Sequence, residues 1–154
     1  MSIKIVESKA HTTIEKVEEF ETLIGRKLPD QYKQFLLQHN GGSPQPPGFQ
    51  FTLKDDDWDM AMVAWFLALY DGEYVNITDY FYRYQDRIPK DMLAIAHDPG
   101  GSFILLGLEG ENKGKIFFWL QELEGDDDEP PTYDNVAFVA NSFNEFLNSF
   151  TEVE

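Results

Sequence analysis

The segment from Thr12 to Gly42 carries start and stop signals for two short helices in a fixed order, and this order limits the possible folds most strongly. Thr12 followed by Glu15 matches a capping box, which predicts that a helix begins there. Gly25 supplies the left-handed residue that commonly ends a helix. Between them, apolar residues recur at helical spacing and predict one buried stripe, made of Ile14, Val17, Phe20, Leu23 and Ile24.

A second helix is predicted directly after the first. Pro29 suits the first turn of a helix, and Asp30 lies where the helix dipole favours an acidic side chain. The run Asn40-Gly41-Gly42 ends this helix. Its expected buried stripe consists of Tyr32, Phe35 and Leu36, with His39 as a further candidate. The chain is therefore expected to begin with a pair of helices.

The middle of the chain predicts strands separated by turns. Phe49, Phe51 and Leu53 alternate with polar residues, as in a half-buried strand, and the Pro-rich residues 43–48 before them predict a rigid connection. Residues 61–69 are compatible with a buried strand or a core helix, and the turn signal Asp71-Gly72 favours the strand. Further strands are expected at residues 93–96, 102–108, 115–120 and 133–139.

Two more helices complete the prediction. Thr78 is expected to cap a central helix that Pro89 stops. Ser142 and Glu145 form a second capping box before a C-terminal helix whose apolar face would hold it against the sheet, at about 1.5–3 kcal/mol for each buried side chain. We therefore predict one α+β domain over residues 1–154, with a mostly antiparallel curved sheet flanked by the N-terminal helix pair, the central helix and the C-terminal helix.

These landmarks also carry a family resemblance. The pattern I-x-x-V-E-x-F-E, followed by L-P-D-Q-Y-K-Q-F-L and N-G-G, resembles the SUKH superfamily, and so does the later run I-P-K-D-M-L-A-I-A-H-D-P-G-G-S-F-I-L-L. The runs K-I-F-F-W-L and A-N-S-F-N-E-F-L are similar to the strand and the C-terminal helix that follow in that family. The chain departs from the family pattern after Trp119. Where many members have an aspartate and often a histidine, this chain has Leu120 and Gln121.

Charge indicates what kind of partner such a chain would bind. With 28 acidic and 12 basic side chains, the formal net charge is −16. This charge would repel nucleic acid and anionic membranes, and would draw in a basic protein. Screening over about 8 Å makes local clusters matter more than the total. We take as candidate partner-binding residues Asp55, Asp56, Asp57, Trp58, Asp59, Asp98, Asp126, Asp127, Asp128 and Glu129.

Two interpretations of these residues stay open at this stage. The acidic loops either bind a partner or only keep the protein soluble. Trp58 either is exposed among the aspartates and anchors a partner, or folds back on the sheet as a lid.

Templates for catalysis and metal binding do not fit the sequence. The chain has no cysteine, which excludes disulfides and thiolate chemistry. The aspartates at 55, 57 and 59 have the spacing of a calcium loop, but Met60 replaces its glycine and Phe66 its closing glutamate. His97 beside Asp98 is expected to end a strand next to a turn-forming aspartate. We predict no catalytic residues, no metal and no cofactor.

Three functions are compatible with these features. The resemblance implies a non-enzymatic immunity protein that masks a basic toxin, such as a nuclease or deaminase, or a regulatory adaptor in cell-wall glucan synthesis like the yeast members. An enzyme with paired carboxylates is the third, and no spacing signal supports it. The N-terminus lacks the apolar core of a signal peptide, and residues 60–70 are about half as long as the ~20 residues that span a bilayer, so we expect a soluble cytoplasmic protein.

Overall fold

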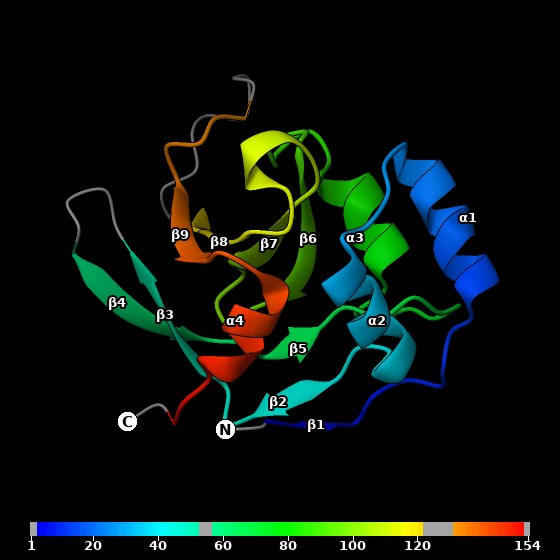
Figure 1. Cartoon of the computed structure of the whole chain (residues 1–154), viewed down its shortest axis with the longest axis horizontal. Coiled ribbons are helices and arrows are strands. Elements are labelled where there is room, and N and C mark those ends of the chain that lie inside the picture. Colours follow the sequence, from blue (N-terminus) through cyan, green and yellow to red (C-terminus); the bar gives the residue numbers. More distant parts are fainter. Residues whose placement is uncertain (1–2, 53–56, 122–130, 153–154) are drawn as a thin grey trace.

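The structure is a computed structural model, and it describes residues 3–52, 57–121 and 131–152. Seven strands form one antiparallel sheet in the order β4-β3-β9-β8-β7-β6-β5 (Figure 1). The strands are β3 (Gly48–Thr52), β4 (Trp58–Met62), β5 (Trp65–Phe66), β6 (Met92–His97), β7 (Phe103–Gly107), β8 (Ile116–Trp119) and β9 (Val136–Ala140). A separate pair joins β1 (Lys4–Val6) to β2 (Ser43–Gln45).

Helices α2, α3 and α4 lie against the sheet, and α1 lies at the outer side of α2 and α3 (Figure 1). Tyr80 and Tyr84 of α3 pack on Phe103 of β7, so we call this side the α3 face. The opposite side, the α4 face, is covered by aromatic residues of α2 and α4. The helices are α1 (Ile14–Ile24), α2 (Asp30–Gln38), α3 (Ile77–Tyr84) and α4 (Phe143–Asn148), and a short 3-10 helix, η1 (Gly110–Asn112), lies between β7 and β8.

The core is built from aromatic rings on the α4 face. Phe146 of α4 contacts Phe49 at 5.6 Å and Phe66 at 6.4 Å between ring centroids, both nearly edge-on. Phe35 of α2 contacts Phe66 at 4.9 Å. Ring pairs in this arrangement stabilise the fold by more than the burial of their surface alone, because the edge of one ring meets the face of its neighbour. The short helix α4 is therefore held by its apolar face, as the sequence predicts.

The sheet is curled, and its two edge strands are consecutive in the chain. β4 ends at Met62 and β5 begins at Trp65, yet these strands are the opposite ends of the strand order. Two residues make the crossing: Val63 N–H donates to the Pro47 carbonyl at 3.0 Å, and Ala64 N–H donates to the His97 carbonyl at 2.8 Å. The two edges therefore come together at this end of the sheet.

The run Asn40-Gly41-Gly42 joins three parts of the chain. The buried Asn40 side chain, 1% exposed, donates to the Ala10 and Leu69 carbonyls at 2.8 and 2.9 Å and accepts from Leu69 N–H at 2.7 Å. Gly42 has a φ of 118°, and a Cβ there would lie 2.6 Å from Ile5. The run ends α2, as predicted, and it also fixes the N-terminal segment against the loop that precedes α3.

Two helices have N-cap residues that differ from those predicted from the sequence. The N-cap of α1 is Thr13, which accepts from Lys16 N–H, and not Thr12, whose hydroxyl is buried without a hydrogen bond. The N-cap of α3 is Asn76 and not Thr78, because the Asn76 side chain accepts from two N–H groups at once. Ile14 and Leu23 are exposed and lie outside the buried stripe.

The prediction of one strand over residues 61–69 is wrong. β4 already begins at Trp58, and the chain leaves it after Met62 to cross to the other edge of the sheet, where β5 has only two residues. Asp71-Gly72 does not close a hairpin; it lies in the loop before α3. An apolar run of this kind cannot reveal the crossing, because both edge segments are apolar. The Pro-rich residues 43–48 contain the strand β2 rather than a simple connection.

The predicted fold class is confirmed, but α3 ends at Tyr84, before the Pro89 that the sequence predicted as its stop. The chain has an α+β fold with a curled antiparallel sheet, an N-terminal helix pair, a central helix and a C-terminal helix. Gly25 ends α1 with a φ of 76°. The Ser142 hydroxyl caps α4 by accepting from Glu145 N–H. The Glu145 carboxylate in turn accepts from Asn141 N–H. Leu53, predicted to end a strand, lies outside the described residues.

We expect Asn40→Ala to lower the free energy of unfolding by about 2–3 kcal/mol, because three backbone groups lose their partner in a mostly buried place. Chemical denaturation measures this. The matched control is Asn144→Ala on the exposed side of α4, which should change stability by no more than about 0.5 kcal/mol. Equal effects of the two variants would contradict the proposed role of Asn40.

Candidate functional site

An open hollow lies where the curled sheet does not close. One side is β4, from Asp59 to Met62, and the other is the turn between β6 and β7, from Asp98 to Ser102. We call the gap between β4 and this turn the seam. Its hollow has a volume of about 520 Å³. The floor is apolar and is formed by Phe51, Phe118 and Leu120.

Asp98 is fixed at one lip of the seam by its own turn. Its Oδ1 accepts from Gly100 N–H at 2.9 Å and from Ser102 N–H at 2.7 Å. Gly101, with a φ of 97°, passes so close to Gln121 that a Cβ would lie 2.6 Å from the Gln121 side-chain oxygen. The D-P-G-G run is thus a rigid turn that sets the position of the Asp98 carboxylate.

Asp59 lies at the other lip, at the start of β4. Its Oδ1 accepts from Met60 N–H at 2.8 Å. Asp59 is the cross-strand partner of Phe51, so its side chain is on the same face as that floor residue. The sequence placed Asp59 and Asp98 in one candidate set, and the structure brings these two residues to the same hollow.

Trp58 is the most exposed tryptophan. Its side chain is 61% exposed, so the structure contradicts the interpretation in which Trp58 folds back as a lid. Trp58 is paired with Thr52, and Thr52 in turn with Phe138, which is 36% exposed. Asp57 is exposed just before it. Trp58 therefore lies beside the seam, on the side of β4 opposite to Asp59.

None of the described residues that line the seam hollow is basic, so neither carboxylate is neutralised from within it. Basic side chains gather elsewhere: Arg26, Lys27 and Lys33 line a different hollow at the turn between α1 and α2. Acidic residues are not confined to the seam, because Glu18 and Glu19 are exposed on α1. The hollow lined by Glu19 and Asp71 also has two carboxylates and apolar residues, but Lys16 lines it as well. What distinguishes the seam is that its two carboxylates and apolar floor have no basic residue among the described lining residues.

Six of the ten candidate residues are not placed. They are Asp55, Asp56, Asp126, Asp127, Asp128 and Glu129, and all of them lie outside the described residues. Their assignment stays a prediction.

The sequence did not reveal the residues that form the apolar floor of the seam. Phe51 was predicted only as strand core, and Phe118 and Leu120 were not candidates. No sequence signal marks such residues, because they become a floor only when the sheet curls and leaves its edge open. The turn at Asp98 did carry a signal, since D-P-G-G specifies a tight turn.

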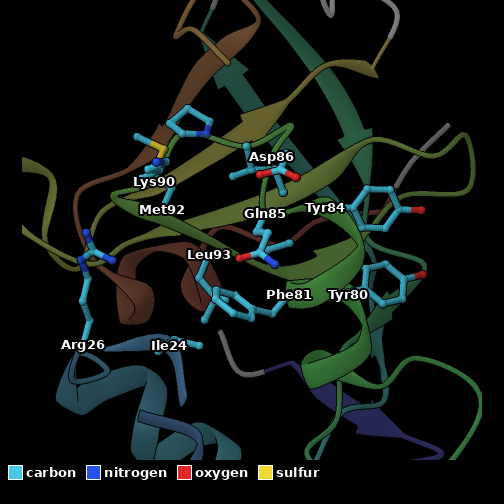
Figure 2. A pocket seen from close by; sticks show the side chains of 13 residues that line it. Ile24, Arg26, Tyr80, Phe81, Tyr84, Gln85, Asp86, Lys90, Met92 and Leu93 are labelled. Carbon is cyan, nitrogen blue, oxygen red and sulfur yellow. The ribbon is translucent and has the colours of Figure 1, made fainter. Parts of the chain in front are cut away.

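A second hollow lies between the end of α1, α3 and β6, with a volume of about 310 Å³. Figure 2 shows Phe81, Leu93 and Ile24 gathered at its centre, whereas the hydroxyls of Tyr80 and Tyr84 point away from it. Charged side chains at its rim have both signs, from Arg26, Lys90 and Asp86. It therefore offers no single-signed site for a charged ligand.

A polar cluster borders this second hollow. Arg26 donates two hydrogen bonds to Glu109, both at 3.1 Å, and this pairing raises the pKa of Arg26 and lowers that of Glu109. The Tyr133 hydroxyl donates to Asp91 at 2.7 Å, and this bond, with some burial, raises the pKa of Tyr133 to about 12. The first pair connects the turn after α1 to the turn after β7, and the second connects the segment before β9 to the residue before β6.

The described residues assemble no recognisable catalytic set. His97 Nδ1 lies 2.9 Å from the Asp98 carbonyl oxygen, so it donates to backbone and not to a carboxylate. The Ser102 hydroxyl accepts from Gln121 N–H, and the neighbouring Asp98 carboxylate accepts from the Ser102 backbone N–H. Within residues 3–52, 57–121 and 131–152, no group of three histidine, aspartate or glutamate side chains is placed to hold a metal ion. Among the described helices, none has both the length and the apolar character needed to cross a bilayer.

A curled antiparallel sheet, a helix pair before it and an acidic hollow at its seam define a small α+β protein. Comparison with known families gives this class a name. The sequence pattern of the SMI1 / KNR4 family (SUKH-1) matches residues 11–149, and the chain belongs to this family. The resemblance to the SUKH superfamily predicted from the sequence is thereby confirmed.

A curated relative is known from Bacillus subtilis (strain 168). It is the SPbeta prophage-derived uncharacterized protein YokK, which is 28% identical over 154 residues, covering 91% of this chain and 75% of the relative. Leu120 and Gln121, where this chain departs from the family pattern, both line the seam hollow. The departure therefore falls inside the candidate site.

We expect Tyr133 to ionise about two pH units above an ordinary tyrosine, because its neutral form donates to the Asp91 carboxylate. Since the folded pKa is raised from 10.0 to about 12, this contribution to stability is complete below pH 10 and is lost as the pH rises through 12. Ultraviolet absorbance of phenolate, compared between the wild type and Tyr133→Phe, measures the pKa. In Asp91→Asn, Tyr133 should ionise nearer to pH 10. An unchanged titration in that variant would refute the assignment.

Proposed function

We propose that this protein is an immunity-type protein, which binds a basic toxin and masks it without performing any chemistry. Membership of the SMI1 / KNR4 family supports an immunity or regulatory role, and the prophage origin of the Bacillus relative fits an immunity role. The observation that carries the proposal is the seam hollow, where Asp59 and Asp98 flank an apolar floor. None of the described lining residues is basic.

The physical basis is electrostatic steering followed by local complementarity. A net charge of −16 attracts a basic protein over a long range, which speeds encounter. At short range, two fixed carboxylates next to exposed Trp58 offer both charge pairs and an aromatic contact. A nuclease or a nucleic-acid deaminase carries basic residues near its substrate channel, so an acidic surface seated there would exclude the substrate.

The test is binding of a toxin domain, taken from a neighbouring gene that encodes one, measured by surface plasmon resonance at increasing salt. We expect the association rate to fall steeply with salt, because exposed charges are screened. Inhibition of the toxin should require a one-to-one complex. Binding that does not respond to salt, or no binding, would contradict the proposal. Capture of envelope-synthesis enzymes instead would favour the regulatory adaptor.

The double variant Asp59→Asn and Asp98→Asn should weaken toxin binding by about tenfold or more, which corresponds to about 1.4 kcal/mol. Asparagine keeps the side-chain oxygen that accepts from the backbone at both positions, so the turn and β4 should be unchanged. The matched control is Glu18→Gln with Glu19→Gln on α1, at the opposite side of the molecule from β4 (Figure 1). It changes the net charge equally, so an equal loss there would mean that only total charge matters.

A further inference from the structure

The seam exposes an edge of β4 with which no other described strand pairs. β4 is the last strand of the sheet order, and β3 is its partner on one side only. The other side of β4 faces the seam, whose far lip is the turn from Asp98 to Ser102. An edge strand of this kind presents backbone N–H and C=O groups that can pair with another extended chain.

The direction of the backbone groups in β4 follows from two hydrogen bonds. Val63 N–H donates to Pro47, which continues the ladder with β3. Met60 N–H instead donates to the Asp59 carboxylate, so it points away from β3 and toward the seam. Since successive residues alternate along a strand, Trp58, Met60 and Met62 present their backbone groups to the open edge.

The Asp59 carboxylate therefore has two roles at the same place. In the free protein it covers the outward N–H of Met60, which is a common way to protect an edge strand. It also faces the apolar floor through its cross-strand partner Phe51. A cation that draws this carboxylate toward the hollow would release the Met60 N–H for pairing. The ion pair and the strand pairing are thus coupled through a single side chain.

We propose that the seam takes an extended segment of a protein partner as an additional strand paired with β4. A lysine or arginine of that segment lies in the hollow between Asp59 and Asp98, and its neighbours along the segment, which are apolar, lie on the side of Trp58 and Met60. This rests on the proposed function, because it specifies how the basic partner binds at the same site.

The chemistry of the hollow selects this occupant. The methylene stem of a lysine or arginine fits the floor of Phe51, Phe118 and Leu120, while its cationic head reaches the two carboxylates at the lips. Strand addition gains affinity from main-chain hydrogen bonds and specificity from alternate side chains. A second copy of this chain is a poor occupant, since pairing two β4 edges would bring together the Asp57 and Asp59 carboxylates of both copies.

To test this, a synthetic peptide of alternating lysine and valine is titrated into the protein, and binding is monitored by nuclear magnetic resonance. We expect chemical-shift changes at β4 and at the turn from Asp98 to Ser102, and slowed hydrogen exchange at Met60 N–H. A peptide of the same composition with its lysines grouped at one end should bind about tenfold more weakly, because it cannot alternate between the two faces. Equal binding of the two peptides, or no shifts at millimolar peptide, would overturn the inference.

Met60→Pro tests the backbone contact directly. Proline removes an N–H that points to the open edge, a position where an edge strand tolerates it, so the ladder with β3 should stay intact. We expect peptide binding to fall about tenfold relative to Met60→Leu, which changes the side chain but keeps the N–H. If the proline variant does not fold, peptides methylated on alternate backbone nitrogens replace it. One methylation register should abolish binding and the other should preserve it, and equal behaviour of the two registers would overturn the inference.

The outcomes separate this inference from the proposed function. If the adjacent toxin domain binds in a salt-dependent way, yet Met60→Pro and Met60→Leu bind it equally, the strand pairing is wrong and the masking function stands. If the alternating peptide binds at the seam and the toxin domain does not bind at all, the masking function is wrong and the seam is still a strand-accepting site.

Discussion

The Asn40 side chain is the interaction on which the rest of this structure depends. Its three hydrogen bonds connect the N-terminal segment at Ala10, the end of α2 and the chain at Leu69 just after β5. Gly42 then passes closely over Ile5, and its carbonyl accepts from Phe66 N–H. Because β5 is one edge of the sheet, this junction fixes where that edge lies relative to the helix pair. The other edge, β4, ends two residues before β5 begins, so the junction also sets the opening of the seam.

Much of the fold is encoded locally and could be predicted. Gly25 ends α1 and Ser142 begins α4 because glycine in the left-handed region and a serine cap each satisfy backbone groups within a few residues. The cap of α3 was misplaced because Asn76 and Thr78 are both suitable residues, and only the loop from Tyr70 decides between them. The strand break after Met62 could not be predicted, since it depends on pairing with Pro47 and His97, which are distant in sequence.

The site was predictable only in part, for a similar reason. Charge and composition pointed to the aspartates near Trp58 and to Asp98, and the structure places Asp59 and Asp98 at one hollow. The apolar floor depends on long-range curvature, which no local pattern of Phe51 or Phe118 expresses. The direction of Met60 N–H depends on which residues of β4 pair with β3, and one residue of register would reverse it. The binding proposed for this surface therefore depends on the topology of the sheet as much as on its charges.

The three tryptophans occupy three different environments, and this has a practical consequence. Trp119 is buried in the sheet with Phe103 stacked on it, Trp65 is half-buried on β5, and Trp58 is exposed beside the seam. Their intrinsic fluorescence therefore comes from separable sources. Emission from Trp58 should shift to shorter wavelength when a bound protein excludes water from it, while emission from Trp119 should respond only when the core opens. The chain thus carries its own optical reporters, one for occupancy of its surface and one for integrity of its interior.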